Sequence, residues 1–169
     1  MNELMPHARV REGIVSSESI RNTIRQLLTR YREYEGLIRY PGDWGERAFR
    51  FWLIKELFMD VLGWDSKYIV FGERYDVLFL DDYIRPKLYL ETKKPDIQIT
   101  KNYVKEAIDR FKEFYSIDYV IITNGTTWVL HDCIKGAEHK IDSIENADDK
   151  KIADVFSKLH AKNYTVMTR

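Results

Sequence analysis

Three charged residues near the middle of the sequence have the types and spacing of a metal-dependent hydrolytic site. Asp76 lies in one apolar stretch, and Glu91 and Lys93 lie in the next. Carboxylate oxygens are the ligands that Mg²⁺ prefers, and a metal held by Asp76 and Glu91 would lower the pKa of a bound water. Lys93 would orient that water or neutralise a phosphate, because negative charge builds on the non-bridging oxygens during hydrolysis. These residues predict hydrolysis of a phosphodiester.

The two apolar stretches are expected to form an antiparallel hairpin that brings these side chains together. Strand side chains alternate between faces, so Glu91 and Lys93 share one face. In an antiparallel pair, the residue numbers of two opposed residues add up to the same total along the whole pair. If Asp76 faces Glu91, the turn centre falls in the middle of the polar loop over residues 81–86. The strand neighbours are strongly apolar, and a buried acid is costly there unless it has a partner.

Helical patterns precede and follow this hairpin. Ser16 and Ser17 offer an N-cap to apolar residues at helical spacing, which predicts a first helix. After the break at Pro41–Gly42, Asp43 is expected to cap a largely buried helix over Trp44–Leu62, and Gly63 stands at its C-terminal end. Two further helices are expected over residues 101–115 and 149–159.

Strand patterns, rich in aromatic and β-branched residues, occupy the remaining segments. Asn124–Gly125 between two apolar runs predicts a two-residue hairpin. The element order becomes α α β β β α β β α, which predicts an α/β fold with a mixed central sheet flanked by helices. The predicted strands cover residues 67–71, 75–80, 87–93, 118–123 and 126–131.

In combination, four stretches resemble the PD-(D/E)xK nuclease superfamily, and most closely the N-terminal nuclease domain of type I restriction enzyme motor subunits and related restriction–modification enzymes. The resemblance covers residues 43–131 and implies a restriction-endonuclease-like core. The four stretches are the first core helix from Glu46 to Leu62-Gly63-Trp64, the strand Tyr75-Asp76-Val77-Leu78-Phe79, the strand Tyr89-Leu90-Glu91-Thr92-Lys93-Lys94-Pro95, and Ile122-Thr123-Asn124-Gly125 followed by Trp128.

The resemblance implies a role for each matching residue. Asp76 and Glu91 would be ligands of Mg²⁺ or Mn²⁺, and Lys93 would be the catalytic lysine. Glu46 would be a fourth catalytic member, aimed at the metal directly or through water, although an acid there also suits the helix dipole. The chain departs from the family in one respect: the Gln-x-x-x-Tyr element of the next helix is absent, and Arg110 or Phe111 stands near the glutamine's place.

A local excess of basic residues follows the predicted site. From Arg85 to Lys112 there are eight Lys or Arg against four acids, although the whole chain has 27 basic and 27 acidic residues and no net charge. A basic stretch in a neutral protein can form a local phosphate-binding face, although a solvated mixed-charge surface is the alternative. Lys94, Lys101 and Lys105 are the predicted contacts to DNA.

Length and composition bound the remaining possibilities. The 169 residues, 44% of them hydrophobic, suit a single nuclease domain with a real core, preceded by a loose arm over residues 1–15. The single cysteine excludes an internal disulfide, and no Cys/His spacing suggests zinc. The apolar runs are of strand length, so we expect no membrane association and a cytoplasmic location.

Several functions compatible with this pattern differ from a DNA endonuclease. One is a nucleic-acid-binding module that kept the fold without catalysis, and another is a structure-specific or RNA-directed nuclease. A third is a structural subunit whose apolar helix over Trp44–Leu62 is an interface instead of core. Because duplex cleavage needs two active sites or two events, a homodimer and a subunit of a restriction-type system are both compatible with nuclease activity.

Overall fold

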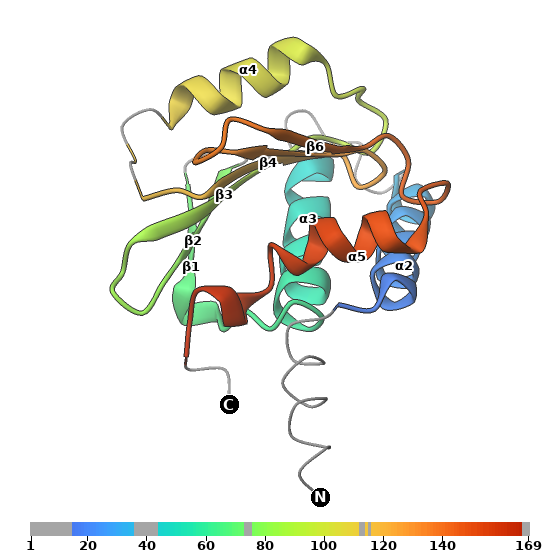
Figure 1. Ribbon diagram of the computed structural model, residues 1–169. Coiled ribbons are helices and arrows are strands. Elements are labelled where there is room, and N and C mark those ends of the chain that lie inside the picture. Colours follow the sequence, from blue (N-terminus) through green and yellow to red (C-terminus); the bar gives the residue numbers. More distant parts are fainter. Residues whose placement is uncertain (1–14, 36–43, 73–75, 112–113, 115, 167–169) are drawn as a thin grey trace, which may run out of the picture.

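Six strands form one mixed sheet at the centre of the fold (Figure 1), as the computed structural model describes it for residues 15–35, 44–72, 76–111, 114 and 116–166. The strands lie in chain order, and only β3 and β4 run parallel. A parallel pair needs a crossover, and helix α4 (Lys101–Arg110) provides it. The strands are β1 (Ile69–Phe71), β2 (Asp76–Leu80), β3 (Pro86–Thr92), β4 (Tyr119–Thr123), β5 (Trp128–Asp132) and β6 (Glu138–Ile141). The predicted α/β class with a mixed sheet is confirmed.

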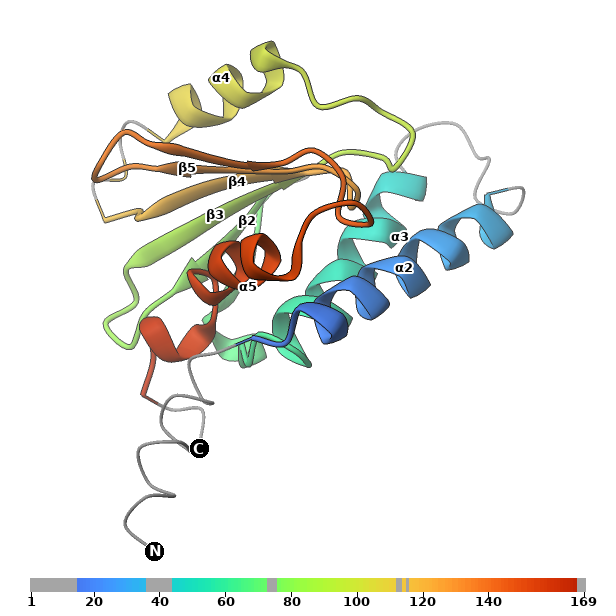
Figure 2. The same cartoon turned by 45° about the vertical axis from the view of Figure 1, so that its right-hand side comes forward.

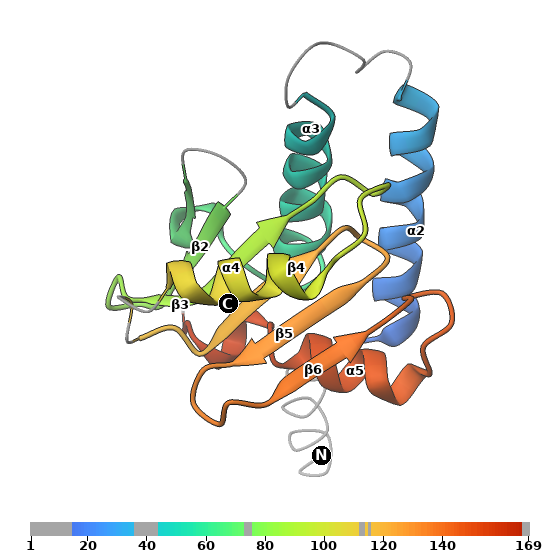
Figure 3. The ribbon, with the colours of Figure 1, turned by 90° about the horizontal axis from the view of Figure 1, so that it is seen from above.

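Helices cover the two faces of the sheet unequally (Figure 2). Helices α2 (Ser17–Tyr34), α3 (Trp44–Trp52) and α5 (Asp149–Ser157) pack on one face around the larger hydrophobic core. Helix α4 packs on the other face over a smaller core that includes Tyr89. Seen from above, α4 lies across the middle of the sheet and leaves β5 and β6 uncovered on that face (Figure 3).

The first two helices agree with their sequence patterns. Ser16 caps α2 by accepting a hydrogen bond from the backbone N–H of Ser19 at 3.2 Å, as predicted. Helix α3 continues as a π-helix over Leu53–Met59, and Gly63 follows with a φ of 79°, the left-handed conformation expected at a helix end. Of the twelve apolar residues over Trp44–Leu62, six are buried and four are partly buried, whereas Trp44 and Phe51 are exposed. The helix is therefore mainly core.

The hairpin of β2 and β3 has the predicted register. Asp76 pairs with Glu91, and the pairing continues in step to Phe79 opposite Leu88. A bulge next to the loop then pairs Leu80 with Pro86. Because the bulge lies at the loop end, it leaves the register at Asp76 unchanged.

Several details of the predicted elements are wrong. The connection of β4 and β5 has four residues instead of two, because the Asn124 carboxamide oxygen accepts hydrogen bonds from the backbone N–H groups of Thr126 and Thr127. Strand β6 was not predicted, because its residues are largely polar. The first predicted strand is shorter, since Ser66–Tyr68 form a 3₁₀ turn before β1. Helices α4 and α5 also end earlier than predicted.

Some predictions concern residues outside the described part of the chain. These are the loose arm up to residue 14, the break at Pro41–Gly42 and the Asp43 cap. Among the helices that the structure describes, none is both long and apolar enough to cross a membrane.

Candidate active site

Strands β2 and β3 place the predicted site residues on the face of the sheet that α4 covers. Asp76 and Glu91 are direct partners in the antiparallel ladder, so their Cβ atoms are about 4.5–5.5 Å apart on one face. Lys93 follows the end of β3, and its backbone N–H donates to the Thr123 carbonyl at 2.9 Å. Its Nζ lies 3.7 Å from Oε2 of Glu91. The structure therefore brings Asp76, Glu91 and Lys93 together.

Glu91 is almost completely buried, with 1% of its side chain exposed. Its Oε1 atom accepts a hydrogen bond from the Tyr89 hydroxyl at 2.9 Å and forms an ion pair with Arg110. Its Oε2 atom is also buried and accepts no hydrogen bond from the described residues. A buried carboxylate is costly unless charges and donors compensate it, and here two cations and a phenol do so. The second oxygen retains capacity for one more cationic partner.

The tyrosine beside Glu91 is held in its protonated form. Burial, together with the negative charge of Glu91, raises the pKa of Tyr89 well above its usual range. Its ring also packs closely against the ring of Phe111 in a tilted arrangement, with the centroids 3.5 Å apart. Tyr89 therefore acts as a fixed hydrogen-bond donor to Oε1 across the pH range of ordinary enzymes.

Helix α4 supplies two of the groups around the site. Tyr103 and Arg110 lie two turns apart and so face the same way. The Lys93 ammonium lies 4.5 Å from the centre of the Tyr103 ring, a cation–π contact that helps to orient it. The Arg110 side chain is 54% exposed, so it reaches Glu91 from solvent and can leave without disturbing the core. Partial burial acts to lower the pKa of Arg110, but Glu91, Tyr89 and Glu106 together outweigh burial, so the pKa of Arg110 is raised.

The Asp76 carboxylate packs directly against the backbone of Gly72. A Cβ atom added to Gly72 would lie 2.5 Å from both Cγ and Oδ1 of Asp76, far closer than real Cβ atoms approach other atoms. The backbone N–H of Gly72 also donates to the Asp76 carbonyl at 2.8 Å. The absence of a side chain at Gly72 therefore decides where the Asp76 carboxylate lies.

Glu46 comes from helix α3, which packs on the face of the sheet opposite to the one that carries Asp76 and Glu91. It belongs to the first turn of α3, which packs in the larger core, and it is 8% exposed. One turn later, Phe49 packs under Gly125 in the turn between β4 and β5, near the C-terminal end of β3. Among the described residues no group of three His, Cys, Asp or Glu is arranged to hold a metal ion. A metal role for Glu46 stays a prediction.

The predicted DNA-binding lysines occupy two places. Lys94 directly follows Lys93 and is half-buried, whereas Lys101 and Lys105 are exposed on α4. On that helix they lie on the side opposite Tyr103 and Arg110. Their contact with DNA stays a prediction.

Two of the residues that contact Glu91 were not predicted from the sequence. Tyr89 precedes Glu91 by two positions, so strand alternation alone places it on the same face and could have identified it. Arg110 stood out only as a departure from the family pattern at the glutamine position. Its contact with Glu91 depends on how α4 crosses the sheet.

No family model matches the sequence, and no curated protein or solved structure matches it significantly.

The donor set of the site fits a hard divalent cation. Mg²⁺ is commonly bound by one or two carboxylates together with waters, so Asp76 and Glu91 suffice as protein ligands. Both are oxygen donors, and Oε2 of Glu91 has no hydrogen bond from the described residues. A lysine beside such a pair of carboxylates can compensate the negative charge of a bound phosphate.

Proposed function

We propose that the protein is a Mg²⁺-dependent phosphodiesterase that cleaves DNA, an endonuclease with a restriction-endonuclease-like core. The observation that carries the proposal is the direct cross-strand pair of Asp76 and Glu91, with the Lys93 ammonium 3.7 Å from Glu91 Oε2. The order of α3, three antiparallel strands, α4 and a further hairpin supports this kind of core. A restriction-type system is the corresponding proposed context.

In the proposed reaction Asp76 and Glu91 hold Mg²⁺ or Mn²⁺. Such a cation, when bound, lowers the pKa of a water and stabilises charge on the phosphate. Gly72 fixes the Asp76 carboxylate, and Tyr89 fixes one oxygen of Glu91. Lys93, steadied by Tyr103, offers a positive charge to the scissile phosphate.

Arg110 has a separate part in this proposal. Its guanidinium neutralises Glu91 Oε1 in the metal-free protein, at a position where a divalent cation would do the same. Being half exposed and planar, it can move to a phosphate, two oxygens of which can accept two parallel hydrogen bonds from the guanidinium. Arg110 would then exchange one anion for another on substrate binding.

The same ion pair favours a second candidate function. If Arg110 and Lys93 satisfy Glu91 permanently, the carboxylate needs no metal, and the protein is a nucleic-acid-binding module without catalysis. The two candidates differ in their response to divalent cations, because only the first has a site that metal stabilises.

Melting curves across a titration of Mg²⁺ or Mn²⁺ separate the two. A cation that binds only the folded state raises stability by about 2.7 kcal/mol at one hundred times its dissociation constant. The melting temperature of the native protein should therefore rise with metal. The Asp76→Asn variant should lose most of this rise and be at least as stable without metal, since one of two repelling charges is gone. Identical responses of the two proteins would exclude a metal site at Asp76 and Glu91.

A further inference from the structure

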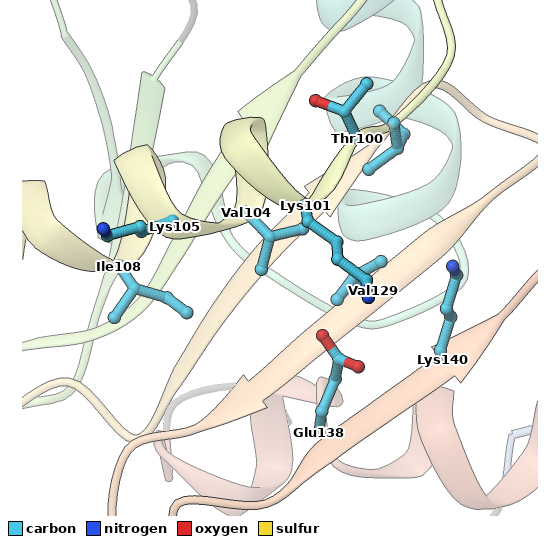
Figure 4. A pocket seen from close by; sticks show the side chains of 9 residues that line it. Thr100, Lys101, Val104, Lys105, Ile108, Val129, Glu138 and Lys140 are labelled. Atoms are coloured by element: carbon cyan, nitrogen blue, oxygen red, sulfur yellow. The ribbon is translucent and has the colours of Figure 1, made fainter.

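A groove lies between α4 and the strands that α4 leaves uncovered (Figure 4). Its volume is about 310 Å³, within the size range of small-ligand sites. Lys101 extends from α4 toward Val129, whereas Glu138 and Lys140 rise from β6 on the opposite wall. The apolar lining consists of Ile99, Val104, Ile108 and Val129.

The groove opens on the same face of the sheet as Glu91. Glu91 pairs with Ile122, Ile122 with Val129, and Val129 with Lys140, so these four residues form one row across the sheet. Partners in a row share a face. Glu91 and Lys140 thus stand on either side of α4, three strand spacings apart.

Charge and lining together define what the groove can bind. Three lysines surround it against one acid, Glu138. In the described part of the chain Lys101 and Lys105 form no ion pair, and Lys140 lies 3.4 Å from Asp142 at a well-exposed position. Three ammonium groups around an aliphatic floor favour an anion that carries an apolar or flat body.

The distance between Glu91 and Lys140 indicates whether one DNA strand could reach both the groove and the proposed active site. Three strand spacings amount to about 14 Å, which is about four nucleotide steps at the rise of about 3.4 Å per step of stacked DNA. A double helix is far too wide to enter a groove of about 310 Å³, but one unpaired base and its phosphate are small enough. A strand that crosses α4 can place one nucleotide here and another at Lys93.

We propose that this groove binds an unpaired nucleotide of the substrate strand, with the base on Val104, Ile108 and Val129 and the phosphate at Lys101 and Lys140. The inference rests on the proposed nuclease function and specifies its substrate: a strand with an unpaired segment, such as single-stranded, frayed or branched DNA. A fully paired duplex would bind only outside the groove.

Fluorescence anisotropy in EDTA tests this without any cleavage. The probes are a labelled single-stranded hexanucleotide, the same strand with abasic sites, and a blunt duplex. The native protein should bind the hexanucleotide more tightly than either of the others. The variant Lys101→Ala/Lys140→Ala should lose this preference, and the magnitude of the slope of log K against log salt should fall by about 0.7, the value for the one phosphate that these two lysines no longer neutralise.

A matched variant controls for net charge. Lys150 and Lys151 are exposed on α5, on the other face of the sheet, and Lys150→Ala/Lys151→Ala removes the same charge. This variant should bind the hexanucleotide as the native protein does. Equal weakening in both double variants, or equal affinity for normal and abasic strands, would overturn the proposal.

The outcome is independent of catalysis. If the groove variant loses strand binding but the native protein cuts nothing in Mg²⁺, the groove stands and the nuclease function fails. If cleavage occurs while the groove variant binds normally, the nuclease stands and the groove assignment fails.

Discussion

Replacing Arg110 by alanine tests how much the ion pair with Arg110 contributes to stabilising the buried carboxylate of Glu91. Glu91 is 1% exposed and Arg110 54% exposed, so the pair is intermediate between buried and surface ion pairs. Losing a partner of a fully buried charge costs about 3–5 kcal/mol, and an exposed pair contributes about 0–1 kcal/mol. Because Tyr89 and Lys93 remain, we expect Arg110→Ala to cost about 1–2 kcal/mol in EDTA. For a chain of this size that lowers the melting temperature by about 2–8 °C.

Metal should reverse this loss. In the native protein a cation at Glu91 competes with Arg110, whereas in Arg110→Ala it meets an uncompensated carboxylate. The variant should therefore bind Mg²⁺ more tightly, and the difference in melting temperature from the native protein should shrink as Mg²⁺ is added.

Calorimetric melting of native protein, Arg110→Ala and Arg110→Lys in EDTA and in Mg²⁺ measures this directly. Arg25→Ala is the matched control, because Arg25 pairs with Glu145 at 2.8 Å where both side chains are about half exposed. That variant should lose no more than about 1 kcal/mol, equally in both buffers. If Arg110→Ala is destabilised by the same amount with and without Mg²⁺, Glu91 is not a metal ligand.

Three further predictions concern other parts of the molecule. Gly72→Ala should displace the Asp76 carboxylate and raise the Mg²⁺ concentration for half-maximal thermal stabilisation, while circular dichroism stays native. Alanine at Lys94, Lys101 and Lys105 together should weaken DNA binding and flatten its salt dependence by about 0.7–0.9 for each phosphate left without its lysine, whereas an unchanged slope would place the DNA elsewhere. Burial, with the charge of Lys162, lowers the pKa of His160, whose Nδ1 accepts from the Lys162 N–H. The unfolded chain therefore takes up this proton first, so stability is full above about pH 6.5 and falls as pH drops toward the lowered pKa; urea midpoints should show a smaller fall in His160→Gln.

The hairpin that carries the site was predictable from local sequence. Strand alternation and the constant sum of paired residue numbers placed Asp76 opposite Glu91, and the observed register agrees. The polar loop that ends at Pro86 is the only connection between the two apolar stretches, so the centre of the turn had to fall within it. Short-range rules suffice here because both strands and their connection lie within one continuous segment.

The partners of Glu91 were less accessible to such reasoning. Arg110 reaches Glu91 from the C-terminal end of α4, and its position depends on how that helix packs across β3 and β4. The relation of Asp76 to Gly72 is a contact between a side chain and the backbone of a residue four positions earlier. Neither follows from the periodicity of hydrophobic residues.

Strand β6 and the turn before β5 show two other limits of sequence patterns. Glu138–Ile141 has mostly polar side chains, yet it pairs with β5 because that strand offers unpaired backbone groups. Asn124 suggested a tight turn, but its side chain binds two backbone N–H groups and so favours a longer loop. Hydrogen bonds to backbone groups decided both cases, between strands for β6 and within the local turn for Asn124.

Cleavage of nucleic acid by defined variants tests the central claim most directly. Supercoiled plasmid and circular single-stranded DNA should each be followed on gels with native protein, Glu91→Gln, Lys93→Ala and the control Lys150→Ala, in Mg²⁺ and in EDTA. We predict cutting by the native protein and Lys150→Ala in Mg²⁺ only. The cleavage rates of Glu91→Gln and Lys93→Ala should be lower than the native rate by a factor of at least about one hundred. Cutting by Glu91→Gln or Lys93→Ala at the native rate, or no Mg²⁺-dependent product from either DNA, would contradict the assignment of this site.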